Sequence, residues 1–380
     1  MREQRADTGM IPPRSAARGV EGSDASSVAD TVDRLFCVAG SPLGPAPSAF
    51  TASTRIDSQA SEYPLVAIVG PTAAGKSALA LFLAEYGSGE IINYDSVQLY
   101  QGFDIGSGKM PPGERRGLAH HLLDILEPDQ VFTAGDYRRA ALIVLDDIRR
   151  RSRLPILVGG TGLYLRALLL GLFEGPPRSE ELRMRLRRMV ERRNPQFLHR
   201  LLARLDPDRA GQIEWPDTQK VIRAIEVCLL ARQPMSRLLE SGRAGLRGFR
   251  IYKIGLNPPR QALYERINLR VEQMFVTGLL EETRAMLARP DAERFKPLEA
   301  VGYRQACEVL RGSLSVADAV RATQTATRHY AKRQLTWFRR ETDVTWFEGM
   351  GDAAEVQQQV LDWLGRQLHP GLANVDGARR

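Results

Sequence analysis

The sequence predicts an α/β protein: a doubly wound parallel β-sheet that carries a phosphate-binding loop and is interrupted by a helical insertion. Three observations predict it. A glycine-rich loop separates an apolar run at 65–69 from an Ala-rich run at 78–84, short apolar runs then alternate with helical patterns, and Arg-dense helices follow Pro176-Pro177. Alternating strands and helices favour a parallel sheet with helices on both faces and ligands at the carboxyl ends of its strands.

The loop reads G-P-T-A-A-G-K-S and matches G-x-x-x-x-G-K-[ST] in the strand-to-helix context that the motif requires. Its glycines let backbone N–H groups converge on an anion, and the next helix adds its positive N-terminus. We expect Lys76 to neutralise phosphate oxygens and Ser77 to hold Mg²⁺. This is typical of a P-loop NTPase-like fold, although the loop alone leaves open whether the phosphates belong to a nucleotide. The predicted diphosphate-binding residues are Gly70, Pro71, Thr72, Ala73, Ala74, Gly75, Lys76 and Ser77.

The remaining elements follow in order along the chain. Short apolar runs at 90–93 and 155–158 predict strands, and the pattern at 137–150 predicts the helix between them. A strand at 250–255 should rejoin the sheet after the insertion. Further helices are predicted at 262–287, 316–340 and 353–364.

Five segments are expected from these patterns. Residues 1–62 are rich in Ala, Ser, Gly, Pro and Arg and show no period, so we expect a disordered extension. The segments are the extension (1–62), the first part of the core (63–176), the insertion (177–248), the second part of the core (249–350), and a C-terminal helix and tail (351–380).

Composition narrows the class of protein. With 380 residues, 43% apolar and 26% charged, the chain is globular. Its three cysteines form no C-x-x-C pair, which argues against a zinc site or disulfide framework and favours a cytoplasmic location. No apolar run is long enough to predict a membrane span. A net charge of +8 is compatible with a nucleic-acid partner.

Two polar residues directly follow predicted strands, so they should lie at the same sheet edge as the phosphate loop. Asp95 is a candidate general base or metal ligand, and the alternative is a turn or capping residue. Thr161, in G-G-T-G, is a candidate donor to an oxygen that gains charge, and the alternative is a tight turn. The loop at 104–109 and the segment at 120–124 could also line the site. No later apolar strand ends in a second Mg²⁺ carboxylate, which weakens an ATP-binding interpretation.

Two helices present cations. Lys220 and Arg223 begin an amphipathic helix at 217–227 and weakly favour a phosphate clamp over a salt-bridged surface. In the helix at 327–340, apolar residues share one side and cations the other, without an acidic residue. Such a face indicates an anion such as a phosphate backbone, or else a solvated surface. The cations are Arg328, Lys332, Arg333, Arg339 and Arg340, with His329 among them.

Together these segments resemble the tRNA dimethylallyltransferases, also called tRNA isopentenyltransferases, of the bacterial type. The resemblance rests on seven ordered motifs: the phosphate loop; D-S-V-Q-L-Y at 95–100 with D-I-G-S-G-K at 104–109; H-H-L-L-D at 120–124; V-G-G-T-G-L-Y at 158–164; D-T-Q-K-V-I-R-A-I-E-V at 217–227; A-V-G-Y-R at 300–304; and Y-A-K-R-Q-L-T-W-F-R at 330–339. No Cys/His zinc module follows, unlike the eukaryotic form. Lys220 replaces the family's usual Arg, which puts that contact in question.

The resemblance implies transfer of a dimethylallyl group from dimethylallyl diphosphate to N6 of the adenosine 3′ of the anticodon, in tRNAs reading codons that begin with U. It implies Asp95 as the base, and Thr161, Lys76, Arg223 and Mg²⁺ on Ser77 as groups that stabilise the departing diphosphate. The partner is the anticodon stem-loop of tRNA, and the expected state is a monomer. The implied tRNA-binding residues are Asp95, Ser96, Val97, Gln98, Thr161, Arg183, Gln219, Lys220, Val221, Ile222, Arg223, Gly302, Tyr303, Arg304, Thr327, Arg328, Lys332, Arg333 and Gln334.

Three other functions remain open at this point. An isopentenyltransferase acting on AMP or ATP would not require the Arg-rich insertion or the basic helix. A small-molecule kinase of the phosphate-loop class would need ATP turnover or a second Mg²⁺ carboxylate. A non-catalytic RNA-binding module would be indifferent to loss of Asp95.

Overall fold

The computed structural model describes residues 62–173, 175–240, 242 and 244–368. Six strands form one parallel sheet in the order β3-β2-β4-β1-β5-β6. The strands are β1 (Tyr63–Val69), β2 (Gly89–Asn93), β3 (His120–His121), β4 (Leu154–Val158), β5 (Phe249–Asn257) and β6 (Val344–Glu348). The central strand β1 therefore delivers the phosphate loop to the middle of the carboxyl edge. Except for Glu62, the predicted extension lies outside the described residues.

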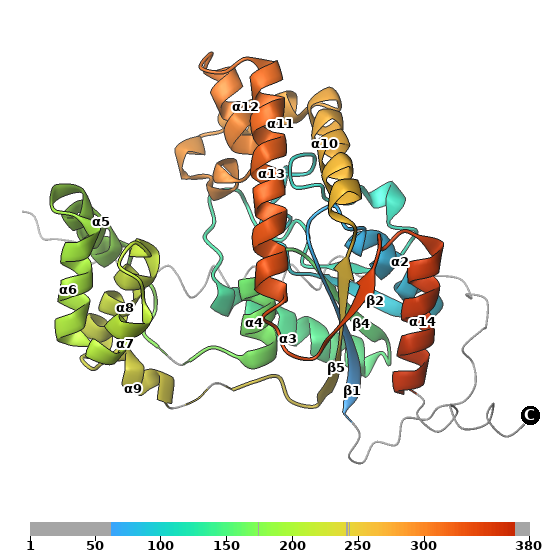
Figure 1. Cartoon of the computed structure of the whole chain (residues 1–380), viewed down its shortest axis with the longest axis horizontal. Coiled ribbons are helices and arrows are strands. Elements are labelled where there is room, and N and C mark those ends of the chain that lie inside the picture. The colour runs from blue at the N-terminus through green and yellow to red at the C-terminus, as the bar shows by residue number, and fades with distance from the viewer. Residues whose placement is uncertain (1–61, 174, 241, 243, 369–380) are drawn as a thin grey trace, which may run out of the picture. The chain divides into compact units, whose positions relative to one another are not determined.

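Helices cover both faces of the sheet, which confirms the predicted doubly wound α/β fold (Figure 1). On one face, α2 (Lys76–Tyr86) and α14 (Ala354–Leu368) share an apolar core with β1, β4 and β5. On the other face lie α3 (Ala134–Arg150) and α4 (Gly162–Leu170), which pack against each other. Alternate strand residues point to the two faces, so strands buried on both sides read as continuous apolar runs.

Five helices between Pro176 and the start of β5 have a core of their own. They are α5 (Glu180–Arg192), α6 (Pro195–Leu205), α7 (Pro207–Gln212), α8 (Thr218–Ala231) and α9 (Met235–Glu240). Polar caps begin several of them: the Asp206 carboxylate, completely buried, accepts hydrogen bonds from the backbone N–H groups of Arg209 and Ser236. Because each cap satisfies otherwise unpaired N–H groups, short helices can follow one another closely here.

The second part of the core contains α10 (Arg260–Val276), α11 (Leu279–Leu287), α12 (Tyr303–Leu310) and α13 (Val316–Phe338). The prediction of one helix over 262–287 was wrong, because Gly278 adopts φ +112° and ends α10 before α11 begins. The sheet strand β6 was not predicted, and the last helix extends four residues beyond its predicted end, to Leu368. No helix among the described residues has the length and apolar character needed to cross a membrane.

Candidate active site

The phosphate loop joins β1 to α2 through two glycines that other residues could not replace easily. Gly70 has φ +140°, and a Cβ there would lie 2.9 Å from the backbone oxygen of Leu256. Gly75 has φ +83° and immediately precedes α2, where a Cβ would meet Asp352 at 2.8 Å. The backbone can therefore wrap tightly at the positive end of α2, as an anion site requires.

Lys76 is buried at the bottom of this loop, and its Nζ donates to the backbone oxygen of Pro71 at 2.7 Å. Burial lowers the pKa of Lys76 to about 7; nearby Asp95 opposes this shift and Arg270 reinforces it. Among the described residues, a carbonyl is the one hydrogen-bond partner of this buried ammonium, which is therefore well placed to turn to a phosphate oxygen. Ser77, the next residue, is exposed and lines the same cavity.

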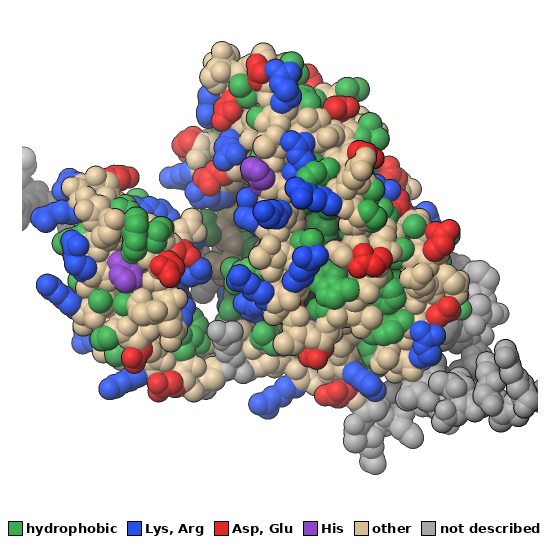
Figure 2. Space-filling model, viewed as in Figure 1, with side chains coloured by type: hydrophobic (Ala, Val, Ile, Leu, Met, Phe, Trp, Pro, Cys, Tyr) green, Lys and Arg blue, Asp and Glu red, His purple; other side chains and the backbone are tan. Residues whose placement is uncertain are grey.

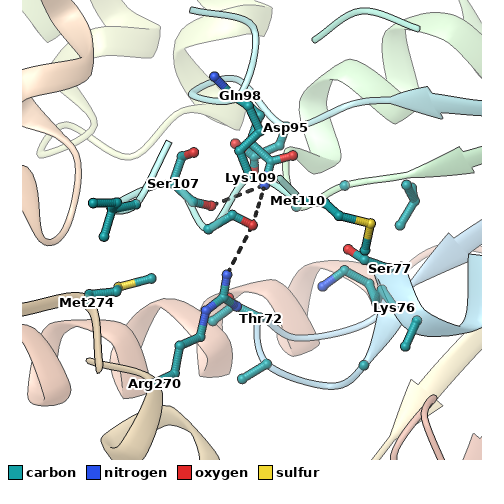
Figure 3. Close-up of a pocket in the computed structure, with 18 of the residues that line it drawn as sticks. Thr72, Lys76, Ser77, Asp95, Gln98, Ser107, Lys109, Met110, Arg270 and Met274 are labelled. Carbon is teal, nitrogen blue, oxygen red and sulfur yellow. Dashed lines mark hydrogen bonds between the residues drawn. The ribbon is translucent and has the colours of Figure 1, made fainter. Parts of the chain in front are cut away.

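Two cavities meet at this edge of the sheet. The phosphate cavity, of about 700 Å³, is lined by the phosphate loop, the loop at 104–109 and one face of α10. The second cavity, of about 620 Å³, lies between Ser96-Val97, Arg304 and α13. Figure 3 shows Asp95, Lys76 and Arg270 around the phosphate cavity. The residues that line both cavities are Thr72, Ala73, Asp95, Ser107, Arg270, Met274 and Tyr330.

Asp95 lies where the two cavities meet, directly beyond β2. The Asn93 side chain fixes its backbone, accepting from the Asp95 N–H at 2.9 Å and donating to the Asp95 oxygen at 3.1 Å. The backbone N–H of Val97 donates to Asp95 Oδ1 at 2.9 Å. Burial raises the pKa of Asp95, against hydrogen bonds from Val97 and Gln98 and the charges of Lys76 and Arg270. A carboxylate made more basic in this way suits a general base.

Thr161 begins α4 and binds the segment that carries Asp95. Its Oγ1 accepts from the backbone N–H of Ser96 at 3.0 Å and donates to Ser96 Oγ at 3.1 Å. The hydroxyl lines neither cavity. Thr161 thus positions the 95–97 turn, and its predicted contact with the diphosphate stays a prediction.

Gln334 on α13 connects three parts of the site. Its Oε1 accepts from the backbone N–H of Thr72 at 2.7 Å, and its Nε2 donates to the oxygen of Gly160 at 3.0 Å. Because both ends of the buried amide are occupied, Gln334 aligns the phosphate loop with the turn after β4. Its predicted contact with tRNA stays a prediction.

The outer face of α13 is basic, as the sequence predicted. Arg328 donates to Asn268 Oδ1 at 2.6 Å, and Arg333 lies over the ring of Tyr330. Within the described part of the chain, none of the five predicted cations forms an ion pair with a carboxylate. Figure 2 shows basic side chains and a histidine along α13. Of the residues predicted to bind tRNA, Ser96, Val97, Arg304, Thr327 and Arg333 line the second cavity, Gln98 and Gln334 line the phosphate cavity, and Asp95 lines both.

The predicted cations of the insertion form ion pairs with carboxylates of the insertion itself, and the phosphate clamp weakly favoured for Lys220 and Arg223 stays a prediction. Lys220 pairs with Asp217, while Arg183 and Arg223 both bind the completely buried carboxylate of Glu226. Burial would raise the pKa of Glu226, but the two arginines hold it below its usual range. Val221 and Ile222 are buried in the insertion core and Gln219 is exposed. The two apolar side chains are therefore packing residues, leaving only their backbone for the predicted contact.

Two further motif residues have structural roles, Tyr303 through its side chain and Gly302 through its backbone. Tyr303 is completely buried; its hydroxyl donates to Glu282 at 2.6 Å and its ring packs against Gly106. The preceding Gly302 has φ +97°, which lets α12 begin at Tyr303. Packing therefore removes the Tyr303 ring from contact with tRNA and leaves Arg304 exposed beside it.

The two additional segments suggested by the sequence have different roles. The loop at 104–109 lines the phosphate cavity, with Lys109 anchored by Tyr100, Asp104 and Asp124. The segment at 120–124 lines neither of the two cavities. His121 instead binds Glu90 at 2.7 Å, within an ion-pair cluster at the sheet edge.

Sequence reasoning missed four charged residues of the phosphate cavity: Glu114, Arg266, Arg270 and Asp352. Arg266 forms a bidentate ion pair with Asp352, in which Nη1 donates to Oδ1 at 2.7 Å and Nη2 donates to Oδ2 at 2.9 Å. Arg266 and Arg270 are four residues apart on α10 and therefore share a face. The spacing of these two arginines can be read from the sequence, but the neighbouring residues do not show whether they face a cavity or the solvent.

A phosphate loop that faces a half-buried carboxylate across a cavity, on a doubly wound parallel sheet, is typical of phosphate-loop α/β enzymes. The IPP transferase family model matches residues 98–341. The chain is 51% identical over 305 residues to the tRNA dimethylallyltransferase of Solibacter usitatus, covering 80% of this chain and 99% of that one. It is 54% identical over 297 residues to that of Koribacter versatilis, covering 78% and 96%. This chain belongs to the tRNA dimethylallyltransferase family.

A solved structure agrees with this assignment. The crystal structure of the full-length tRNA isopentenylpyrophosphate transferase from Bacillus halodurans is similar, with a TM-score of 0.60 and 35% sequence identity. The similarity covers 81% of this chain and 98% of that one.

Proposed function

We propose that this chain transfers a dimethylallyl group from dimethylallyl diphosphate to N6 of the adenosine 3′ of the anticodon, in tRNAs that read codons beginning with U. The placement of Asp95 between the two cavities carries the proposal. The phosphate loop opens into one cavity, and the basic face of α13 borders the other. A diphosphate ester and an adenine base can therefore approach the same carboxylate from two sides.

The chemistry requires a base, because the lone pair of an exocyclic adenine amine is delocalised into the ring. As N6 bonds to the first carbon of the dimethylallyl group, the carbon–oxygen bond breaks and its electron pair leaves with the diphosphate. Asp95 takes the proton from N6, and its raised pKa favours that transfer. Lys76 and the N–H groups of the phosphate loop stabilise the charge on the leaving group.

Mg²⁺ fits this site only as a partner of the diphosphate. Within the described residues, no group of three or more His, Cys, Asp or Glu side chains could hold a metal ion. The exposed hydroxyl of Ser77 would hold Mg²⁺ together with phosphate oxygens and water, a common coordination for this ion. When bound, Mg²⁺ would supply positive charge to the departing diphosphate.

The second cavity suits a base turned out of the anticodon loop. A stacked adenine could not bring its amine to Asp95, so the target must leave the stack, as single-stranded loop bases readily do. Arg304 and Arg333 line this cavity and would contact the neighbouring phosphates. The free thiols of Cys228 and Cys307 support a reducing cytoplasm.

The test is transfer of radiolabel from dimethylallyl diphosphate, with Mg²⁺, into unmodified tRNA with three consecutive adenosines from the last anticodon base onward. AMP serves as the parallel acceptor. Label in tRNA alone supports the proposal. Label in AMP alone would make the chain a nucleotide isopentenyltransferase, and label in neither would favour a kinase.

A further inference from the structure

Within the described part of the chain, two of the cations that line the phosphate cavity have no carboxylate close enough to form an ion pair. Its four basic lining residues fall into two groups. Lys109 pairs with Asp104 and Asp124, and Arg266 pairs with Asp352. Among the described residues, Lys76 and Arg270 have no carboxylate within 4.0 Å. The two unpaired cations lie in one cavity, so an anionic ligand would relieve their repulsion.

Arg270 is aimed into the cavity rather than out to solvent. It is partly buried, and its side chain reaches from α10 toward the loop that carries Ser107 and Lys109 (Figure 3). Its single hydrogen bond within the described part of the chain is a long one, from Nη2 to the oxygen of Gly108 at 3.4 Å. A guanidinium has five N–H donors in a planar fork that fits phosphate oxygens, so most of its capacity remains unused.

Gly108 provides independent evidence that this approach is built into the fold. It has φ +60°, and a Cβ at this position would lie 1.5 Å from Arg270 Nη2. Any other residue would therefore displace the guanidinium. The second glycine of D-I-G-S-G-K thus has a physical role, which is to admit Arg270 to the cavity.

Arg270 also affects the two groups on which the chemistry depends. Its charge lowers the pKa of Lys76, and Asp95 acts against burial to keep Arg270 charged. Because Arg270 lines both cavities, it lies on the boundary where the bond to the diphosphate would break. A cation at that position would stabilise the charge that develops on the leaving oxygen.

We propose that Arg270 is a catalytic residue that binds the leaving diphosphate directly, opposite the phosphate loop. The identity of the ligand rests on the proposed function, whereas the role in anion binding does not. Gly108 is a positioning residue for this contact.

The competing explanation is that Arg270 only supports the loop at 104–109, and Arg270→Met separates the two. The variant keeps an apolar side chain of similar length, and Arg260→Gln, an exposed arginine at the start of the same helix, is the control. Calorimetric titration with inorganic pyrophosphate and the melting temperature without ligand are measured for each. We expect Arg270→Met to weaken pyrophosphate binding roughly 10- to 100-fold, as loss of hydrogen bonds to a charged group does.

The unligated melting temperature should stay the same or rise, since an uncompensated charge is removed. Unchanged pyrophosphate affinity would overturn the proposal. If the Met variant is destabilised, Arg270→Lys decides: it keeps the charge and loses the planar fork, so weaker binding at an unchanged melting temperature supports the proposal and unchanged binding refutes it. If wild-type protein labels no tRNA, yet Arg270→Met loses pyrophosphate binding, the proposed function fails and the role of Arg270 stands.

Discussion

The affinity for dimethylallyl diphosphate should fall as pH rises above neutrality, because Lys76 loses its proton in the unligated protein. Its pKa there is about 7. The bound diphosphate favours the charged ammonium and so raises this pKa. Well below pH 7 the lysine is charged in both states and contributes no pH dependence. Above pH 7, binding must first recruit a proton, and affinity falls up to tenfold per pH unit.

The size of the effect follows from the fraction of Lys76 that is protonated. About half is charged at pH 7 and about one part in a hundred at pH 9, so the dissociation constant should rise roughly 50-fold between them. The terminal phosphate of the ligand, with a pKa of about 6, is already ionised across this range. Binding at pH 8 should therefore take up about 0.9 proton per site.

Titration calorimetry without tRNA measures both quantities, since no transfer occurs and two buffers of different ionisation enthalpy report proton uptake. Lys76→Met is the matched control: it should bind more weakly and show no pH dependence above pH 7. A wild-type affinity that stays constant from pH 7 to 9, with no proton uptake, would refute the argument that burial controls this lysine.

Three further substitutions test other parts of the structure. Asp95→Asn should slow single-turnover transfer by roughly 10²- to 10⁴-fold while tRNA affinity in a filter-binding assay stays near wild type; a parallel loss of tRNA binding would contradict a role in proton transfer. Glu226→Gln leaves two partly exposed arginines without their buried partner and should destabilise the insertion by about 1.5–3 kcal/mol, seen as faster hydrogen exchange in α8 but not in β1. Glu282 accepts hydrogen bonds from the N–H groups of residues 104–106 and from the Tyr303 hydroxyl. Glu282→Gln should therefore speed hydrogen exchange in the loop at 104–109, with a loss of local stability of about 1–3 kcal/mol. Unchanged exchange there would show that the backbone holds this loop unaided.

The parts of the site that sequence predicted well are those that depend on local structure. The phosphate loop needs only a strand, two glycines and a helix, and Asp95 needs only to follow a strand. Both conditions appear in a few consecutive residues. The basic face of α13 was equally accessible, because the helical period alone separates Lys332 and Arg333 from the buried Ala331 and Gln334.

The remaining features depend on partners that are distant in the sequence. Arg270 has the same spacing as surface cations, and only the packing of α10 in the folded protein places it in the phosphate cavity beside Gly108. The buried Tyr303 ring depends on such a partner, since its hydroxyl donates a hydrogen bond to Glu282, 21 residues earlier in the sequence. The ion pair of Arg223 could have been predicted from the sequence. Glu226 lies three residues later on the same helix, a spacing that favours an ion pair.

The bond between Gln334 and the phosphate loop has a consequence for the order in which the protein folds. The bonded residues, Gln334 and Thr72, are 262 positions apart, and the backbone N–H of Gly351 donates to Ala74 at 2.8 Å. Contacts of such long sequence separation form late, after local helices and neighbouring strands. During synthesis, the loop near the beginning of the sheet must therefore wait for residues 334–351 to leave the ribosome. Diphosphate binding would then report completed folding, so affinity for this ligand could serve to separate finished molecules from partly folded ones.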